Sequence, residues 1–207
     1  MSLLIRDLIL KKKLLIFDFD GTLVDTSKYH QQAFSKILSN KNMHFSYKDI
    51  AGMNSQSAFK KIFLQNDHTI SSNELITLVK DEQKYARKLI RNHLEINPDV
   101  LSFLEWTRNI HAFKSCIVSS GSKDTINTVL EKFKIKHYFE FILSAENIIN
   151  SKPSPDGFLK ALEISGVHPR DAIIFEDSDS GIKSAKNANI EFIKVNNIFW
   201  RDLAQTI

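Results

Sequence analysis

Short apolar runs alternate with longer stretches in which apolar residues recur at helical spacing. The runs that predict strands are Lys13–Phe17, Cys116–Val118, Phe139–Leu143, Ala172–Phe175 and Glu191–Val195. A run of this length with polar residues on either side is typical of a buried strand. The stretches between them, such as 124–133, 158–164 and 180–188, have helical spacing. Strands and helices in alternation predict an α/β fold with a doubly wound parallel sheet, built by right-handed crossovers.

The span after the first strand has a different character. From Thr26 to about Asn97, apolar residues recur three or four positions apart and no strand pattern interrupts them. Ser71 or Ser72 stands where a helix N-cap is expected, with Glu74 in the following turn. We therefore expect an all-α cap domain of residues 26–95, inserted into a catalytic core of residues 1–25 and 96–207.

Polar side chains follow four of the predicted strands. Asp18 and Asp20 come after the first strand, Ser119 and Ser120 after the second, Lys152 in the loop after the third, and Glu176 and Asp177 after the fourth. The carboxyl ends of parallel strands meet at one edge of the sheet, so these groups are expected to converge. Carboxylates gathered in one place need a cationic partner, and Mg²⁺ accepts carboxylate and phosphate oxygens.

The same residues form four motifs in order along nearly the whole chain. They are Asp18-Phe19-Asp20-Gly21-Thr22, then Ser119, then Lys152-Pro153-Ser154-Pro155-Asp156, then Phe175-Glu176-Asp177-Ser178 with Gly181. In this pattern the sequence resembles the haloacid dehalogenase superfamily, in particular its phosphatases and β-phosphoglucomutase-like members with a helical cap after the first motif. The first and last motifs are specific, whereas the serine and lysine matches are weak alone.

The resemblance implies a phosphatase that works through an aspartyl phosphate. Asp18 would attack phosphorus, and Asp20 would act as the general acid and base. Lys152 would neutralise the phosphate and orient Asp18, while the hydroxyl of Ser119 and the amide of Ser120 would bind phosphate oxygens. Asp18, the carbonyl of Asp20 and Asp177 would hold Mg²⁺, with Glu176 as a further candidate ligand. Thr22, Asp25 and Thr26 are interpreted as turn residues.

Substrate choice is expected to lie in the cap. His30 is a candidate substrate contact, since some relatives place a histidine there, and Gly52 lies where relatives have a loop that reaches the site. β-Phosphoglucomutases carry basic residues in that loop, but here the positions are Ala51 and Ser55. This difference favours a phosphatase over a sugar phosphomutase. The mutase stays the alternative, because Lys60, Lys61 or Lys84 could replace the missing charge.

Composition narrows the remaining classes of function. The 207 residues carry a net charge of +4, which suggests nucleic-acid binding, but the lysines are scattered and form no basic helix face. One cysteine, Cys116, permits no internal disulfide, as in cytoplasmic proteins. The apolar segment 3–10 contains Arg6 and Asp7, which disfavours a signal peptide or membrane span. We expect a cytoplasmic monomer or weak dimer whose partner is a small phosphorylated metabolite. A non-catalytic protein that binds such a metabolite is the alternative from another class.

Overall fold

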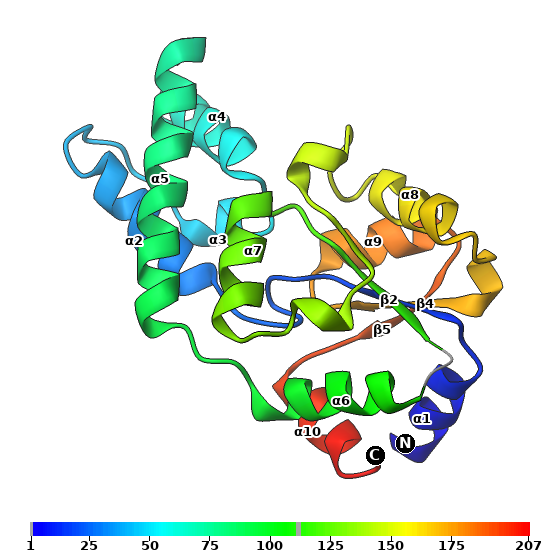
Figure 1. The fold of residues 1–207 in the computed structure, drawn as a ribbon. Coiled ribbons are helices and arrows are strands. Elements are labelled where there is room, and N and C mark those ends of the chain that lie inside the picture. Colours follow the sequence, from blue (N-terminus) through cyan, green and yellow to red (C-terminus); the bar gives the residue numbers. More distant parts are fainter. Residues whose placement is uncertain (1, 111–112) are drawn as a thin grey trace.

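A five-stranded parallel sheet forms the centre of the protein (Figure 1). The computed structural model describes residues 2–110 and 113–207. The strands are β1 (Leu14–Phe17), β2 (Lys114–Val118), β3 (Phe141–Leu143), β4 (Ala172–Glu176) and β5 (Glu191–Lys194), in the order β3-β2-β1-β4-β5. Phe17 at the end of β1 lies opposite Ile117 of β2 and Phe175 of β4. The residues that follow these three strands therefore emerge side by side.

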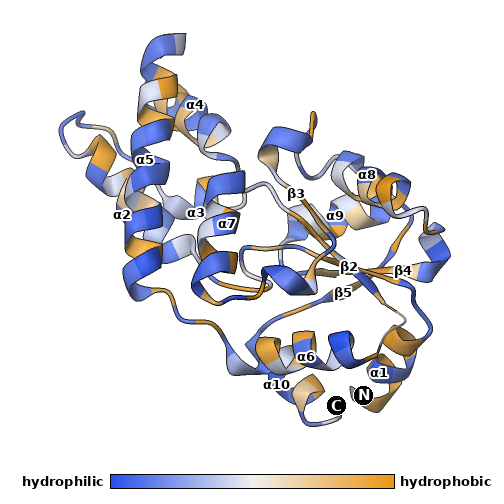
Figure 2. Cartoon of the chain, viewed as in Figure 1, coloured by the Kyte–Doolittle hydropathy of each residue, from blue (hydrophilic) through white to orange (hydrophobic). Residues whose placement is uncertain are grey.

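Helices cover both faces of the sheet, because successive side chains of each strand point to opposite sides. Leu15 and Phe17 pack with helices α6 (Pro98–Asn109), α7 (Lys123–Lys132) and α10 (Asn197–Ala204), and with Ile9 of α1 (Ser2–Leu10). Leu14 and Ile16 pack with α8 (Asp156–Ser165) and α9 (Asp179–Asn187). Figure 2 shows hydrophobic residues along the strands between these layers. The predicted doubly wound α/β fold is confirmed.

Four helices between β1 and α6 form a separate apolar cluster. They are α2 (Ser27–Leu38), α3 (Tyr47–Ile50), α4 (Ser55–Gln65) and α5 (Ser72–His93). Phe34, Phe59 and Leu75 are buried in this cluster, which shares no residue with the two clusters at the sheet. Ser71 is the N-cap of α5 and accepts a hydrogen bond from Glu74 N, as the sequence predicts. The described residues of this span contain no strand.

Helices form at both ends of the chain, where no helix was predicted. Residues 2–10, which were weighed only as a signal peptide or membrane span, form α1, and the C-terminal tail, residues 196–207, contains α10. Trp200 of α10 is 1% exposed and donates a hydrogen bond from Nε1 to the carbonyl of Thr22, so the tail packs beneath the first motif. The third strand is shorter than predicted, since 3₁₀ helix Lys136–Tyr138 precedes it. Two further 3₁₀ helices are Ala145–Asn147 and Pro169–Asp171.

Candidate active site

Lys152 joins two carboxylates at the carboxyl edge of the sheet. Asp18 directly follows β1, Glu176 ends the neighbouring β4, and Lys152 lies in the loop before α8. The Lys152 ammonium donates hydrogen bonds to Asp18 Oδ1 and, over 2.7 Å, to Glu176 Oε1. All three side chains are about nine-tenths buried or more. A buried ion pair of this kind is costly unless every charge is partnered, so its presence here points to a chemical role.

Burial perturbs the titration of these groups. It raises the pKa of Asp18 to about 8, and Lys152 opposes this rise while Glu176 adds to it. Burial also raises the pKa of Asp177 to about 6, with a further contribution from Glu176. For Lys152, burial disfavours the charge, but the carboxylates of Asp18 and Glu176 outweigh it and raise the pKa. The Lys152 ammonium group thus pairs with two carboxylates, and Asp177 adds a third acidic group beside them with no bond to it, so acidic groups outnumber the cation.

The same cluster has the donor chemistry of a divalent-metal site. One carboxylate oxygen each from Asp18, Glu176 and Asp177 lies within 4.8 Å of the others. Glu176 uses both oxygens inside the protein, since Oε1 accepts from Lys152 and Oε2 accepts from Ser178 N at 2.7 Å and Ser178 Oγ at 3.0 Å. Asp18 and Asp177 are therefore better placed to ligate a cation, and a cation would relieve the excess negative charge.

Two residues of the first motif position Asp177. Thr22 Oγ1 donates a hydrogen bond to Asp177 Oδ1 over 3.2 Å. Gly21 has φ +90°, and a Cβ atom there would lie 2.2 Å from Asp177 Oδ2, so only glycine allows this close approach. Thr22 was expected to be only a turn residue. The structure shows that its side chain also orients a predicted metal ligand from 155 positions away.

Asp20 lies beside this cluster, next to the start of α2, the first of the four helices α2–α5 that we call the cap. Its Oδ1 accepts a hydrogen bond from Thr26 N over 2.6 Å, which fixes the carboxyl group at the start of α2. Burial raises its pKa, while the charge of His30 and the bond from Thr26 lower it. Asp25 Oδ1 accepts from Ser27 N over 3.0 Å, in line with the predicted turn role.

A cavity of about 450 Å³ connects this cluster to the cap, which is an ordinary size for a small-molecule site. Ser119 and Ser120 line it after β2, and the Ser119 hydroxyl accepts a hydrogen bond from Gly121 N over 3.0 Å. The residues predicted as catalytic, metal-binding or phosphate-binding all line this one cavity. They are Asp18, Asp20, Ser119, Ser120, Lys152, Glu176 and Asp177. Their chemical roles stay predictions.

Comparison with known proteins agrees with this geometry. The family model described as haloacid dehalogenase-like hydrolase matches residues 15–195. The chain belongs to this family. It is 26% identical over 182 residues to the fructose-1-phosphate phosphatase YqaB of Escherichia coli, covering 87% of this chain and 95% of the relative. It is 27% identical over 183 residues to the phosphoglycolate phosphatase of Aquifex aeolicus, covering 85% of this chain and 81% of the relative.

A solved structure shows the same relationship. The β-phosphoglucomutase of Clostridium difficile superposes with a TM-score of 0.81 at 26% identity, covering 93% of this chain and 88% of that one. The predicted membership of the haloacid dehalogenase-like hydrolases is confirmed, and so is the expected enzyme class, since the two relatives named above are phosphatases. Within residues 2–110 and 113–207, no helix combines the length and hydrophobicity needed to cross a bilayer.

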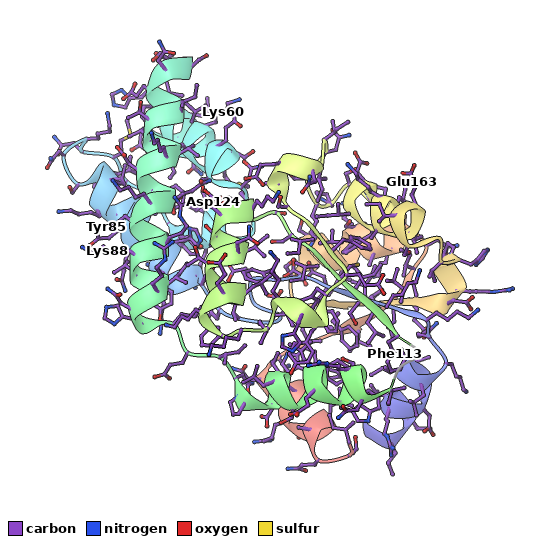
Figure 3. All side chains as sticks on the ribbon, in the orientation of Figure 1. Lys60, Tyr85, Lys88, Phe113, Asp124 and Glu163 are labelled. Carbon is purple, nitrogen blue, oxygen red and sulfur yellow. The ribbon has the colours of Figure 1, made fainter. Side chains whose placement is uncertain are left out.

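The candidate substrate contacts of the cap differ in where they lie relative to the cavity. His30 and Gly52 both line the cavity, and Gly52 has φ +75°, while their role as substrate contacts stays a prediction. Lys60, Lys61 and Lys84 do not line it. Lys61 donates to the carbonyl of Asp49, and Lys60 lies on α4 (Figure 3). In the described part of the chain, the cap side of the lining contains no lysine or arginine.

Sequence reasoning missed Glu82. This α5 residue is fully buried, and its carboxylate bonds His30 and Ser55, which lie on two other cap helices. The only available signal was its position among apolar residues of α5, four places after Leu78 and four before Ala86. Because neither partner lies on the same helix, no local pattern indicates the contact.

Proposed function

We propose that this protein is a Mg²⁺-dependent phosphatase of small phosphomonoesters that acts through an aspartyl phosphate. The observation that carries the proposal is the Lys152 ammonium held between Asp18 and Glu176, with Asp177 close enough to share a cation with Asp18. Phosphoryl transfer depends mainly on positioning and charge neutralisation, and this cluster supplies both.

Asp18 is the proposed nucleophile. A carboxylate oxygen of Asp18 forms a bond to phosphorus, and the bond between phosphorus and the ester oxygen of the substrate breaks. Lys152 fixes the orientation of Asp18 and offsets the charge of the phosphate. Ser119 and the amide of Ser120 bind phosphate oxygens. Mg²⁺, held by Asp18, the carbonyl of Asp20 and Asp177, would supply charge neutralisation and alignment of the phosphate.

Asp20 is the proposed general acid and base. Its raised pKa favours the protonated form needed to give a proton to the leaving oxygen. In the second half of the reaction, the Asp20 carboxylate takes a proton from water. That water attacks phosphorus, phosphate leaves, and Asp18 is restored. The hydrogen bond from Thr26 N keeps Asp20 beside the cavity in both halves.

Residues 26–95 act in this proposal as a cap over a core of residues 1–25 and 96–207. The separate apolar cluster of α2–α5 supports a body of its own, and a cap can exclude water from a reactive intermediate. We also propose a cytoplasmic location, where thiols such as that of Cys116 stay reduced.

The cap favours a substrate with one phosphate and a neutral, oxygen-rich organic group. Its polar lining residues are uncharged apart from His30, for example Tyr47, Asn54, Ser55 and Gln83. Such side chains suit hydroxyl groups, whereas a second phosphate would lack a guanidinium or ammonium partner on this side. Sugar phosphates and polyol phosphates fit best. A sugar phosphomutase is the second candidate, favoured by the similarity to β-phosphoglucomutase.

A phosphate-release screen over a metabolite panel tests the proposal. Wild type and Asp18→Asn are compared with Mg²⁺ and with a chelator. We expect release by wild type with Mg²⁺ and loss of release in the other arms. Release that survives Asp18→Asn or chelation refutes the mechanism. Interconversion of hexose 1- and 6-phosphates without net release supports the mutase, and binding without turnover supports a non-catalytic protein.

A further inference from the structure

Glu82 is a buried carboxylate outside the cluster around Asp18. It is fully buried on α5, yet both of its oxygens are engaged. Oε1 lies 2.7 Å from His30 Nδ1 of α2, and Oε2 accepts a hydrogen bond from the Ser55 hydroxyl of α4 over 2.8 Å. A buried carboxylate destabilises a fold unless it is fully partnered. The chain has placed one such group where three cap helices meet beside the cavity.

His30 connects this carboxylate to the reaction centre. Both His30 and Ser55 line the cavity, whereas Glu82 lies behind them. His30 is also close enough to Asp20 for its charge to lower the Asp20 pKa. Because Glu82 engages Nδ1, Nε2 is the ring nitrogen available to a molecule in the cavity.

The groups around His30 favour its charged form. Burial lowers the pKa of the ring and Arg87 of α5 opposes the charge, but Glu82 of α5 and Asp20 after β1 outweigh them and raise the pKa. A protonated ring has a hydrogen on both nitrogens. His30 is then the one positive side chain that the described cap residues present to the cavity.

We propose that Glu82 is a positioning residue, which holds the His30 ring as a charged hydrogen-bond donor toward the organic group of the substrate. This inference rests on the proposed function and adds the part of the site that recognises the leaving group. The Asp18 and Lys152 cluster binds the phosphate, while His30 donates to an oxygen on the far side of the scissile bond. Glu82 itself touches no substrate.

The Glu82→Gln variant separates this role from simple packing. Glutamine has nearly the same shape and can still bond His30 and Ser55, so the helices stay joined. It removes the negative charge that raises the pKa of the His30 ring. If Glu82 only packs the helices together, Glu82→Gln should keep the wild-type kcat/KM. If Glu82 positions His30, kcat/KM should fall.

The kinetic test compares Glu82→Gln, His30→Asn, the double variant and the control Glu74→Gln, on a substrate found in the screen. Glu74 lies on the same helix and pairs with Lys41, outside the cavity lining. Loss of the hydrogen bond from a charged donor should lower kcat/KM by about 10- to 100-fold in either single variant. The double variant should lose no more than His30→Asn alone, because both act through one group. A loss equal to the product of the two single effects overturns the proposal, as does wild-type kcat/KM in Glu82→Gln.

A second measurement needs no substrate and so separates this inference from the proposed function. Nitrogen-15 NMR of the histidine rings reports whether both nitrogens of His30 carry protons. We expect the His30 ring to keep its second proton to a higher pH in wild type and in Glu74→Gln than in Glu82→Gln. An unchanged ring in Glu82→Gln refutes the proposal even if the enzyme is active. If the ring changes as expected but no phosphoester is hydrolysed, the proposed function fails while the pairing of Glu82 with His30 stands.

Discussion

Replacing Gly21 by alanine tests whether the first motif positions Asp177 for a metal. The backbone of Gly21 has φ +90°, and the new Cβ would lie 2.2 Å from Asp177 Oδ2. Ordinary contact begins at 3.4 Å, so the carboxylate must retreat by about 3.4 − 2.2 = 1.2 Å. Mg²⁺ demands near-ideal octahedral geometry, with oxygen ligands at about 2.0–2.1 Å. A displacement of this size therefore removes Asp177 from the site.

Two effects of the substitution can be separated by a matched control. The left-handed backbone strains any side chain at Gly21, at a cost of about 1–3 kcal/mol of unfolding free energy. Gly166, which ends α8, has φ +66°, and a Cβ atom there would meet nothing within 4 Å. Gly166→Ala should thus lose a similar amount of stability, about 1–2 kcal/mol, with no effect on the site. Only Gly21→Ala should also weaken Mg²⁺ binding, by about 10- to 100-fold.

Urea denaturation measures the first effect, and isothermal titration calorimetry with Mg²⁺ measures the second. Both variants must be folded at the temperature of the titration, which circular dichroism verifies. Wild-type Mg²⁺ affinity in Gly21→Ala would show that the close approach of Gly21 to Asp177 has no bearing on the metal. Equal weakening of Mg²⁺ binding in Gly166→Ala and Gly21→Ala would show that backbone strain, rather than displacement of Asp177, is the cause.

Three further predictions concern the same cluster and the tail. Lys152→Met leaves the buried Asp18 and Glu176 carboxylates without a cation. It should lower the unfolding free energy by about 3–5 kcal/mol at pH values above the Asp18 pKa. The loss should be smaller in mild acid, where Asp18 is protonated and carries no charge. Urea denaturation of this variant at several pH values checks the loss, and a loss that does not depend on pH would contradict the assignment. Folding raises the pKa of Asp177 from 3.8 to about 6 and that of Asp18 from 3.8 to about 8, so the folded protein binds these protons more tightly than the unfolded chain. Without metal, the unfolding free energy should therefore fall as pH rises through this range. Mg²⁺ should restore more of this stability at high pH than at low pH. Thermal denaturation with Mg²⁺ or chelator across this range measures the effect, and stability that rises with pH without metal would be the opposite result. Trp200→Phe removes the hydrogen bond to the buried Thr22 carbonyl and should cost about 1–3 kcal/mol by urea denaturation, whereas the same change at the more exposed Trp106 should cost less.

The carboxylates proposed to act in catalysis could be predicted because each lies at or just after the end of a strand, whereas Lys152 lies in the loop before α8. A buried apolar run followed by a polar residue marks such a position in the sequence, and the parallel sheet then brings these ends together. Asp18 after β1 and Glu176 at the end of β4 meet for this reason, since β1 and β4 are neighbours. The contacts that hold them have no such local sign. Thr22 and Asp177 are separated by 155 positions, and Thr22 and Trp200 by 178.

The helices of the cap could be predicted from their apolar periodicity, but the polar contacts on the side of the cap toward the cavity could not. Helical periodicity shows which residues are buried, and Glu82 fits that pattern among Leu75, Leu78 and Ala86. The pattern does not show that the buried side is shared with α2 and α4, or that a charge is needed there. His30 and Glu82 are 52 positions apart, and only the packing of the helices brings them to 2.7 Å.

The arrangement of the apolar clusters explains how one reaction can serve different substrates in this family. The residues proposed to contact phosphate and metal follow strands of the sheet, whereas most buried residues of α2–α5 form their own cluster, with Tyr29 and Ile90 packed against the sheet instead. Substitutions on the cap side of the cavity, as at Ser55 or Gln83, can therefore change the organic group that is accepted without disturbing Asp18 or Lys152. Glu82 is an exception, because its charge reaches Asp20 through His30. A change there alters recognition and proton transfer together, so Glu82 should tolerate less variation than the cavity-lining residues in front of it.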